Sequence, residues 1–331
     1  MFIILLILNF SFIFFFTKLS KLINIFDIPL DRRKIHKKPI ASIGGILIFL
    51  NIFIYFTFME YKYFYLNIPL TYFNNYDFLI FFIFSTLFFL IGFYDDKFNL
   101  SANFKLILFS LIIMLLLFLS ENLLLTHLKF SFLANPISIS FIAFPFLILC
   151  FLLYLNAFNM FDGINLQSSL YSKSIFLIFI LKGIFIDISL IMLLSLIFFS
   201  YLNFKNKCFL GNNGALLIAF IIAFLFIKSQ NTLYPILADE IFLAMAVPGF
   251  DLLRLAIQRF CNKKHPFHPD RNHLHHLLLK RIGYKKTLLL VLSIIIIPNY
   301  LSILYGNTEY FIILTLLIYS YIIFKFNKSY K

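Results

Sequence analysis

The chain of 331 residues has no tryptophan, so any aromatic belt at a membrane surface must come from its tyrosines and phenylalanines. Cysteine is nearly absent: Cys150, Cys208 and Cys261 are an odd number, and none belongs to a CxxC pair. This count argues against a disulfide framework, and we interpret the three as small apolar residues. Charge is also scarce, because only 13% of the residues are charged and fourteen are acidic. A pair of carboxylates at a membrane edge is therefore a candidate for function.

Hydrophobic residues make up 62% of the chain, and the mean hydropathy of +0.96 excludes a soluble domain of this length. Apolar runs long enough to cross a bilayer, about 17–25 residues, recur from end to end. The sequence predicts an all-α fold, a polytopic transmembrane helical bundle that forms one integral membrane domain over 1–331. We expect about eleven spans, near 1–17, 42–58, 78–93, 104–119, 138–156, 169–181, 184–202, 214–227, 234–250, 287–303 and 310–325. The first lacks the basic start and the cleavage site of a signal peptide, so we expect a retained helix.

Lysine and arginine divide unevenly between alternate loops. Of the 28, four lie on one side (Lys62, Lys129, Lys182 and Lys228) and 24 on the other. The positive-inside rule places the richer side in the cytoplasm, with the N-terminus outside and the C-terminus inside. The polar cytoplasmic loops are then 18–41, 94–103, 156–168, 203–213 and 251–286.

The net charge of +14 thus lies largely on one face, and three interpretations compete. Membrane topology alone accounts for much of the charge. Attraction to anionic lipid headgroups is the second interpretation, and binding of a phosphorylated, anionic substrate is the third. Nucleic acid fits least, since nothing in the chain resembles a nucleic-acid-binding module.

Two adjacent carboxylates, Asp95 and Asp96, follow directly on the uncharged run 78–93. Like charges repel each other and are costly near hydrocarbon. Divalent cation binding and proton abstraction most often require such a pair. The alternative is a solvated turn in which Asp96 and Lys97 neutralise one another, and it fits less well because no polar spacer separates the pair from the span.

A second motif, 156–165, follows a predicted span. On a helix, Asn156, Asn159 and Asp162 recur at i, i+3 and i+6 and form one polar stripe. Asparagines at a membrane edge also serve as caps or interhelical contacts. Asp162 followed by Gly163 instead indicates a helix end that leads into a site.

Two further motifs lie on the same predicted face. The segment 27–45 is basic, as a topology-setting loop would be, and it ends in Gly44–Gly45, a pair that permits close approach of a backbone or a ligand. The segment 203–214 ends in the run GNNG and by itself would pass as an ordinary turn.

The strongest motif is 250–276, in which five of the seven histidines fall within twelve residues. On a helix His273 and His276 share a face while His275 points elsewhere, and no cysteine or carboxylate spacing completes a zinc site. A cluster of arginine, aspartate and histidine is as well suited to hold a diphosphate.

Together these motifs resemble those of the polyprenyl-phosphate N-acetylhexosamine-1-phosphate transferases, the integral membrane glycosyltransferase family 4. The matching segments, spread over about nine-tenths of the chain, are DRRKIHKKP with its Gly-Gly, GFYDDKFNLS, NAFNMFDGIN, GNNG, FDLLRLAIQRF and HPFHPDRNHLHHLLL. The His-x-His-His form is similar to the branch that starts O-antigen, common-antigen and teichoic-acid linkage units.

The resemblance implies transfer of a sugar-1-phosphate from a UDP-N-acetylhexosamine, typically UDP-GlcNAc, to undecaprenyl phosphate, with release of UMP. It implies a Mg²⁺ cofactor, with Mn²⁺ as an alternative. It also implies a multi-pass protein of the bacterial inner membrane, with a cytoplasmic active site, that begins a cell-wall or lipopolysaccharide pathway. The partners are then the two substrates and membrane lipid, a homodimer is allowed, and nucleic acid is not a partner.

The resemblance also implies roles for individual residues. The catalytic aspartates are Asp95, Asp96 and Asp162, and one of the adjacent pair would deprotonate or position the lipid phosphate. The metal ligands are Asp96, Asp162 and Asn212. The positions that match substrate-binding residues are Lys37, Lys38, Asn156, Asn159, Asn165, Arg254, Asp270, Arg271, His273, His275 and His276.

Two positions depart from the family pattern. The family has Gly-Asp-x-Gly-Ser where this chain has Asn212 and Ala215, and a second aspartate where it has Asn165. An amide oxygen can still bind Mg²⁺ but contributes no charge. The amide of Asn165 can still bond to the edge of a uracil.

Two hypotheses from other classes stay open beside an active transferase. Asn212 favours a catalytically impaired homologue that binds polyprenyl phosphate or a partner. A transporter of anionic solutes is disfavoured, because ionisable residues within spans are scarce and transporter sites usually lie at the midplane. The transferase hypothesis requires Asp95, Asp162 and His273 to converge at the inner leaflet.

Overall fold

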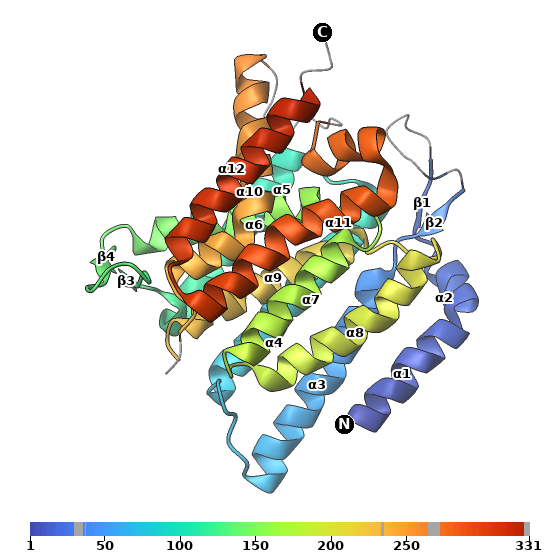
Figure 1. Ribbon diagram of the computed structural model, residues 1–331. Coiled ribbons are helices and arrows are strands. Elements are labelled where there is room, and N and C mark those ends of the chain that lie inside the picture. Colours follow the sequence, from blue (N-terminus) through green and yellow to red (C-terminus); the bar gives the residue numbers. More distant parts are fainter. Residues whose placement is uncertain (30–35, 37, 233–234, 264–271, 328–331) are drawn as a thin grey trace. The chain divides into compact units, whose positions relative to one another are not determined.

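The computed structural model of the protein describes residues 1–29, 36, 38–232, 235–263 and 272–327, and these are mostly α-helical (Figure 1). The helices are α1 (Phe2–Phe14), α2 (Phe16–Ile23), α3 (Gly44–Leu66), α4 (Asn75–Phe98), α5 (Ala102–Leu119), α6 (Ala143–Phe161), α7 (Gln167–Leu181), α8 (Ile186–Phe204), α9 (Gly211–Ser229), α10 (Ala238–Cys261), α11 (Leu274–Tyr305) and α12 (Thr308–Asn327). A short 3₁₀-helix, η1, spans Glu121–Leu123. Two small antiparallel pairs join β1 (Phe26–Asp27) to β2 (Ile40–Ala41) and β3 (His127–Leu128) to β4 (Ile137–Ser138).

The helices occur at the predicted apolar ranges, and the all-α prediction is confirmed. Within the described residues, eight helices are long and apolar enough to cross a bilayer, and a bent pair at the start brings the count to nine if it forms one span. That pair corrects the expectation of one helix over 1–17: α1 and α2 meet at Phe15 with a bend of 74°. The count of about eleven spans and the orientation of the termini stay predictions.

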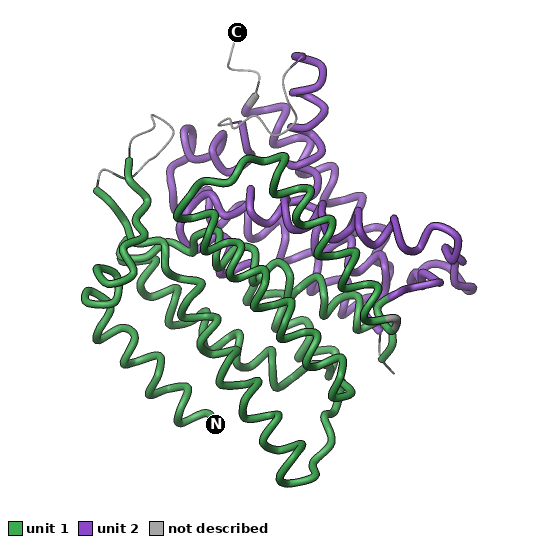
Figure 2. The backbone as a smooth tube through the Cα atoms, turned by 180° about the vertical axis from the view of Figure 1, so that it is seen from behind, with its two compact units in different colours: residues 1–123, 172–234 green, residues 124–171, 235–331 purple. Residues whose placement is uncertain are grey.

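Two compact units make up the chain (Figure 2). Unit 1 comprises 1–123 and 172–234, and unit 2 comprises 124–171 and 235–331. The predicted single domain over 1–331 stays a prediction, and each unit is described by itself below.

Unit 1 is built around α9, whose apolar stretch is 89% buried. A helix that is hydrophobic on all sides belongs in a core, and α9 packs against both α3 and α4. Side-chain caps begin the neighbouring helices: Asn74 accepts from the backbone N–H of Asp77 at the start of α4, and Ser101 caps α5. Three helices end on an asparagine in the left-handed conformation, at Asn24, Asn67 and Asn99. Asparagine tolerates this backbone better than other residues that carry a Cβ.

An amide pair fastens α1 to α3 inside the apolar interior. Asn9 donates to Asn51 Oδ1 at 2.7 Å, and Asn51 donates back to Asn9 Oδ1 at 3.2 Å. Both side chains are fully buried. Hydrogen bonds of this kind hold helices together where no hydrophobic driving force acts between them.

We expect Asn9→Leu to loosen α1 from α3. The loss should be about 1–2 kcal/mol, because the replacement removes both bonds and leaves Asn51 Oδ1 without its donor. The effect is measured by heating the protein in detergent and following protease cleavage near the first helix. Ser11→Leu on the exposed side of α1 is the matched control, and equal losses for the two variants would contradict the assignment.

Unit 2 is organised around α10, which packs against α6, α11 and α12. A buried chain of hydroxyls supports this packing: the Tyr154 and Tyr171 hydroxyls lie 3.3 Å apart, and Tyr171 donates to the carbonyl of Ala244 at 3.1 Å. The start of α11 is set off by a kink at Gly283, whose φ of +74° is readily adopted only by glycine. The part of α11 before Gly283 therefore forms a separate segment that carries His275 and His276.

Candidate active site

Within unit 1, the carboxylate of Asp96 caps the start of α9. Its Oδ1 accepts from the backbone N–H of Asn212 at 2.8 Å, and its Oδ2 accepts from the backbone N–H of Asn213 at 3.0 Å. The side-chain amide of Asn213 also donates to Oδ2, at 2.5 Å. The first amides of a helix have no partner within it and attract anions. Asp96 thus holds the GNNG turn by three bonds.

Glycines bring α3, α4 and α9 unusually close together at this point. A Cβ added at Gly92 would overlap the backbone of Asn212 and Asn213, and one at Gly45 would overlap Asn213 and the backbone of Gly214. Backbone bonds from Gly44 to Phe209 and from Gly45 to Leu210, at 3.0 and 3.1 Å, fix the same junction. The close approach expected for Gly44–Gly45 is confirmed. Unit 1 therefore gathers three motifs that are far apart in the sequence.

Asp95 faces a different partner from Asp96. Asp95 is 2% exposed, and its carboxylate accepts from the Lys105 ammonium at 2.9 Å and from the backbone N–H of Leu100 at 2.8 Å. The alternative of mutual neutralisation by Asp96 and Lys97 is wrong, because Asp96 caps α9 and the Lys97 ammonium lies over the Phe98 ring. Lys105 was not predicted as a site residue.

The basic segment before α3 is anchored by His36. Its Nε2 lies 2.8 Å from Asp27 Oδ2, its Nδ1 lies 2.9 Å from the carbonyl of Lys38, and its ring contacts Phe209. Lys38 is exposed. Lys37, the other predicted substrate-binding lysine here, lies outside the described residues.

Within unit 2, Asp162 stands where α6 ends, as expected for a helix end that leads into a site. Ser168 Oγ donates to its Oδ1, and Gln167 donates to the carbonyl of Phe161 at 2.8 Å. Burial raises the pKa of Asp162 to about 6, and the bond from Ser168 opposes this shift. The carboxylate is thus held at a free-energy cost, which a bound cation would relieve.

The predicted polar stripe on α6 is confirmed. Asn156, Asn159 and Asp162 are all half-buried, while the intervening Ala157 and Phe158 are buried. The Asn156 amide donates back to the carbonyl of Leu152 at 2.7 Å. After the stripe, the backbone carbonyl of Asn165 accepts from the Tyr284 hydroxyl of α11 at 3.0 Å.

The histidine motif differs from its predicted arrangement. His273 precedes α11 in an extended conformation instead of lying on the helix. The three rings therefore gather: the ring centre of His275 lies 5.6 Å from that of His273 and 4.3 Å from that of His276, and the His273 and His276 centres are 6.2 Å apart. The expectation that His275 points away from the other two is wrong. Asp270 and Arg271 lie outside the described residues.

The third and fifth motifs meet in unit 2 through a glycine. A Cβ added at Gly163 would overlap the His275 ring. His275 is 2% exposed, and its Nδ1 lies 3.5 Å from the Gln167 amide. Gly163, next to Asp162, is thus the position that lets the imidazole approach the end of α6.

We expect Gly163→Ala to displace His275 and to lower activity without unfolding the protein. The added methyl group must push the ring away, because it would share the space of the imidazole. Gly249→Ala in α10 is the control, since nothing lies within 4 Å of its added Cβ. Activity and melting temperature measured for both variants check this expectation; normal activity of Gly163→Ala would contradict it.

Asp251 was not predicted as a site residue, although it is held by more side chains than Asp162. It accepts from His273 Nδ1 at 2.9 Å, from Arg254 at 2.8 Å and from the Tyr319 hydroxyl at 2.9 Å. Although burial opposes it, the hydrogen bond from His273 and the charge of Arg254 hold the pKa of Asp251 well below its usual range. Arg254, predicted to bind substrate, is engaged by Asp251, Tyr319 and the carbonyl of Asn272.

The described residues contain no group of three or more His, Cys, Asp or Glu side chains placed to hold a metal ion alone. Mg²⁺ often needs no such group, because one or two carboxylates and the phosphates of a substrate suffice. Asp162 fits that requirement as a half-buried carboxylate at a helix end. Asp96 fits it less well, because both of its oxygens already accept hydrogen bonds from α9.

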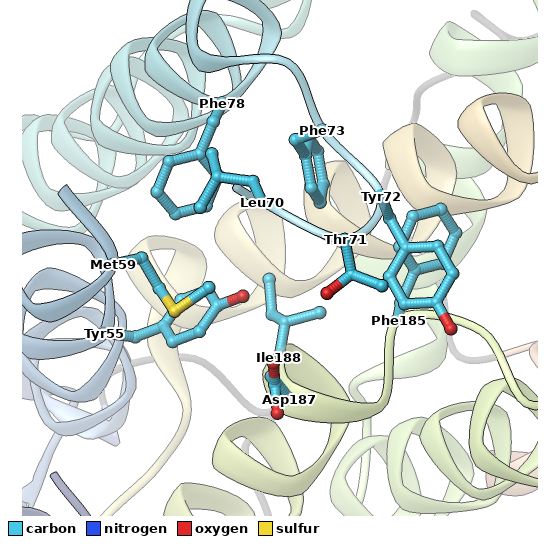
Figure 3. Close-up of a pocket in the computed structure, with 10 residues that line it drawn as sticks. All are labelled: Tyr55, Met59, Leu70, Thr71, Tyr72, Phe73, Phe78, Phe185, Asp187 and Ile188. Carbon is cyan, nitrogen blue, oxygen red and sulfur yellow. The ribbon is translucent and has the colours of Figure 1, made fainter. Parts of the chain in front are cut away.

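Figure 3 shows a small cavity in unit 1, near the start of α4 and so at the opposite end of that helix from Asp96. Its ten lining residues are Tyr55, Met59, Leu70, Thr71, Tyr72, Phe73, Phe78, Phe185, Asp187 and Ile188. None of these is basic, and the one charged group is the Asp187 carboxylate. The cavity therefore does not suit an anionic substrate.

Comparison with known proteins agrees with these motifs. The model of the family described as "Glycosyl transferase family 4" matches residues 78–230. An undecaprenyl-phosphate alpha-N-acetylglucosaminyl 1-phosphate transferase of Thermotoga maritima is 26% identical over 302 residues, which cover 89% of this chain and 87% of the relative. The protein of the same name from Escherichia coli K12 is 24% identical over 283 residues (81% and 73%). A probable undecaprenyl-phosphate N-acetylglucosaminyl 1-phosphate transferase of Bacillus subtilis is 28% identical over 200 residues (57% and 54%). Over residues 78–230 the chain is thus similar to glycosyl transferase family 4, and over most of its length it is similar to transferases of the names given above.

Proposed function

We propose that this protein transfers N-acetylhexosamine-1-phosphate from a UDP-sugar, UDP-GlcNAc in the first instance, to undecaprenyl phosphate. The products are undecaprenyl-diphosphate-sugar and UMP, and the reaction begins a cell-surface polysaccharide. The observation that carries the proposal is the junction of Asp162–Gly163 with the three histidine rings in unit 2. The names of the relatives support the choice of substrates.

The reaction brings two anions together, because an oxygen of the lipid phosphate attacks the β-phosphorus of the nucleotide sugar. Bound Mg²⁺, or Mn²⁺, would supply positive charge that stabilises the diphosphate and the leaving UMP. Asp162 is the residue that fits this ion best, and Asp96 and Asn212 are the other proposed ligands. His275 and His276 hold the phosphate oxygens, since imidazole N–H groups donate hydrogen bonds to them.

The two adjacent aspartates have different roles in this proposal. Asp96 keeps the start of α9 in place through its bonds to Asn212 and Asn213. Asp95, paired with Lys105, positions the lipid phosphate or accepts its proton. The stripe of Asn156 and Asn159 lies next to Asp162 and contacts the nucleotide sugar.

The membrane setting is part of the proposal. We infer about eleven spans, counting α7 and α10 with the apolar helices, and place the polar loops at the cytoplasmic face of a bacterial inner membrane. We infer one catalytic domain over 1–331. An acceptor with a long apolar tail requires chemistry at the membrane surface, which agrees with site residues at helix ends, such as Asp162 after α6.

The test is transfer of tritiated GlcNAc from UDP-GlcNAc to undecaprenyl phosphate, in membranes that contain or lack the protein, with Mg²⁺ or with EDTA. We expect label in the lipid fraction and UMP in the aqueous one only with protein and Mg²⁺. Asp95→Asn should abolish transfer. A parallel assay with UDP-GalNAc as the donor shows which hexosamine the protein transfers. Undiminished transfer by Asp95→Asn would remove Asp95 as the candidate base.

Asn212 favours a second function, which is binding of lipid phosphate by a catalytically impaired homologue. The backbone N–H of Asn212 lies 2.8 Å from Asp96 Oδ1, so Asn212→Asp places a second carboxylate near the first. We expect this variant to be less stable in EDTA and to regain stability with Mg²⁺. A large gain in transfer rate would show that the chain has lost a metal ligand; an unchanged rate would favour full activity of the asparagine form.

A further inference from the structure

The carboxylate of Asp251 forms a buried junction of three elements of unit 2. Asp251 lies on α10, His273 precedes α11, and Tyr319 lies on α12. Asp251 is 7% exposed and Tyr319 is 4% exposed. The backbone N–H of Leu274 also donates to Asp251, at 3.2 Å. The junction is therefore enclosed and fixed by several bonds.

The junction determines which nitrogen of His273 carries a proton. The Asp251 carboxylate also accepts from the Arg254 guanidinium and from the backbone N–H of Leu274. A carboxylate paired with arginine in this way can only accept, so His273 Nδ1 must donate across the 2.9 Å contact with Asp251 Oδ2. The proton on Nδ1 leaves Nε2, on the other side of the ring, as the nitrogen available to a ligand. A carboxylate that fixes the tautomer and orientation of a histidine in this way raises its effectiveness without touching the substrate.

Tyr319 completes the junction from the last helix. Its hydroxyl donates to Asp251 Oδ1 at 2.9 Å and accepts from Arg254 Nε at 2.9 Å. Without it, Oδ1 loses a donor and the guanidinium loses an acceptor, although the bond between Arg254 and Asp251 stays. The hydroxyl therefore holds the carboxylate and the guanidinium at a fixed angle to each other.

We propose that Asp251 and Tyr319 are positioning residues that hold His273 with its Nδ1 proton on Asp251, so that its Nε2 is kept as a hydrogen-bond acceptor for an O–H or N–H group of the nucleotide sugar. The substrate in this statement rests on the proposed function. The fixed tautomer rests on the geometry alone. Through Tyr319, α12 contributes to the site although it carries none of the motifs described above.

The first test measures kcat and KM for UDP-GlcNAc in Tyr319→Phe, Asp251→Asn and, as the matched control on α12, Tyr321→Phe. Tyr321 is 62% exposed. We expect Asp251→Asn to lower kcat by about 10²–10⁴-fold and Tyr319→Phe by about 10-fold, with small changes in KM and with Tyr321→Phe unaffected. A kcat of Tyr319→Phe equal to that of the control would overturn the proposal.

The second test separates positioning from simple packing, and it does not require activity. Nitrogen NMR of ¹⁵N-histidine-labelled protein, with His273→Gln to assign the signal, reports which ring nitrogen is protonated. We expect an Nδ1–H form in the wild type and in Tyr319→Phe, and an Nε2–H form in Asp251→Asn, because an amide can donate to Nδ1. An unchanged tautomer in Asp251→Asn overturns the proposal even if transfer is found, and the expected change supports it even if the substrate proves different.

Discussion

Asp162→Asn should inactivate the protein and stabilise it at the same time. Transfer should fall by about 10²–10³-fold or more, because the carboxylate that would hold the metal ion beside the phosphates is lost. The amide resembles the protonated acid, which burial favours, and the amide oxygen that replaces Asp162 Oδ1 can still accept from Ser168. The gain in free energy of unfolding at pH 7 should be about 2–3 kcal/mol, from a shift of the Asp162 pKa to about 6.

The direction of the stability change in Asp162→Asn depends on the pH. A carboxyl group with a raised pKa in the folded state stabilises the fold fully below its unfolded value, and this contribution is lost as the pH rises through about 6. Melting temperatures in EDTA should therefore favour Asp162→Asn at pH 8 and should nearly coincide with wild type at pH 4. Ser168→Ala is the control that removes the hydrogen bond and keeps the charge. A variant that is inactive and also unstable at pH 8 would contradict the assignment.

Lys228→Met should be the most destabilising single change in unit 1. Lys228, near the end of α9, pairs with Asp77 in the first turn of α4, and the two residues are 8% and 1% exposed. Ser120 and Asn122 donate to the same carboxylate, at 3.1 and 3.2 Å. Removal of the lysine leaves a buried carboxylate without its counter-ion, at a cost of about 3–5 kcal/mol.

A double variant shows whether the charge or the packing matters. Asp77→Asn together with Lys228→Met removes both charges, and the amide still accepts from Ser120 or Asn122. We expect the double variant to recover most of the melting temperature lost in Lys228→Met. Lys207→Met, at an exposed lysine of the same unit, should have little effect. If the double variant were as unstable as the single one, the cost would come from lost packing and the ion pair would contribute nothing.

The helices were predictable because apolar runs and charged loops alternate so sharply in this chain. The break at Phe15 was not, because neither proline nor glycine marks it and the bend is absorbed by one residue with φ of −90° and ψ of 8°. The close packing at Gly45 was predictable, because two adjacent glycines at the start of a span leave room for another backbone. The sequence could not reveal that the backbone of α9 would fill this room.

The site was predictable where function requires rare residue types, such as aspartate and histidine in an apolar chain. It was not predictable where common residues act through tertiary contacts. Tyr319 is one of 18 tyrosines, and its role depends on the distance in space to Asp251, 68 positions earlier in the sequence. Likewise, His275 joins the other two rings because His273 leaves the helix before its first turn, a boundary that the histidine spacing does not indicate.

Transfer of the β-phosphorus is the most direct test of the proposed reaction. UDP-GlcNAc labelled with ³²P at the β-phosphate is incubated with the protein, undecaprenyl phosphate and Mg²⁺, and the lipid and water phases are counted. Transfer of sugar-1-phosphate predicts ³²P in the lipid product, one atom for each GlcNAc, and unlabelled UMP in the water phase. Label that stays in the water phase as UDP while GlcNAc enters the lipid would contradict the account, because it would mean transfer of the sugar alone.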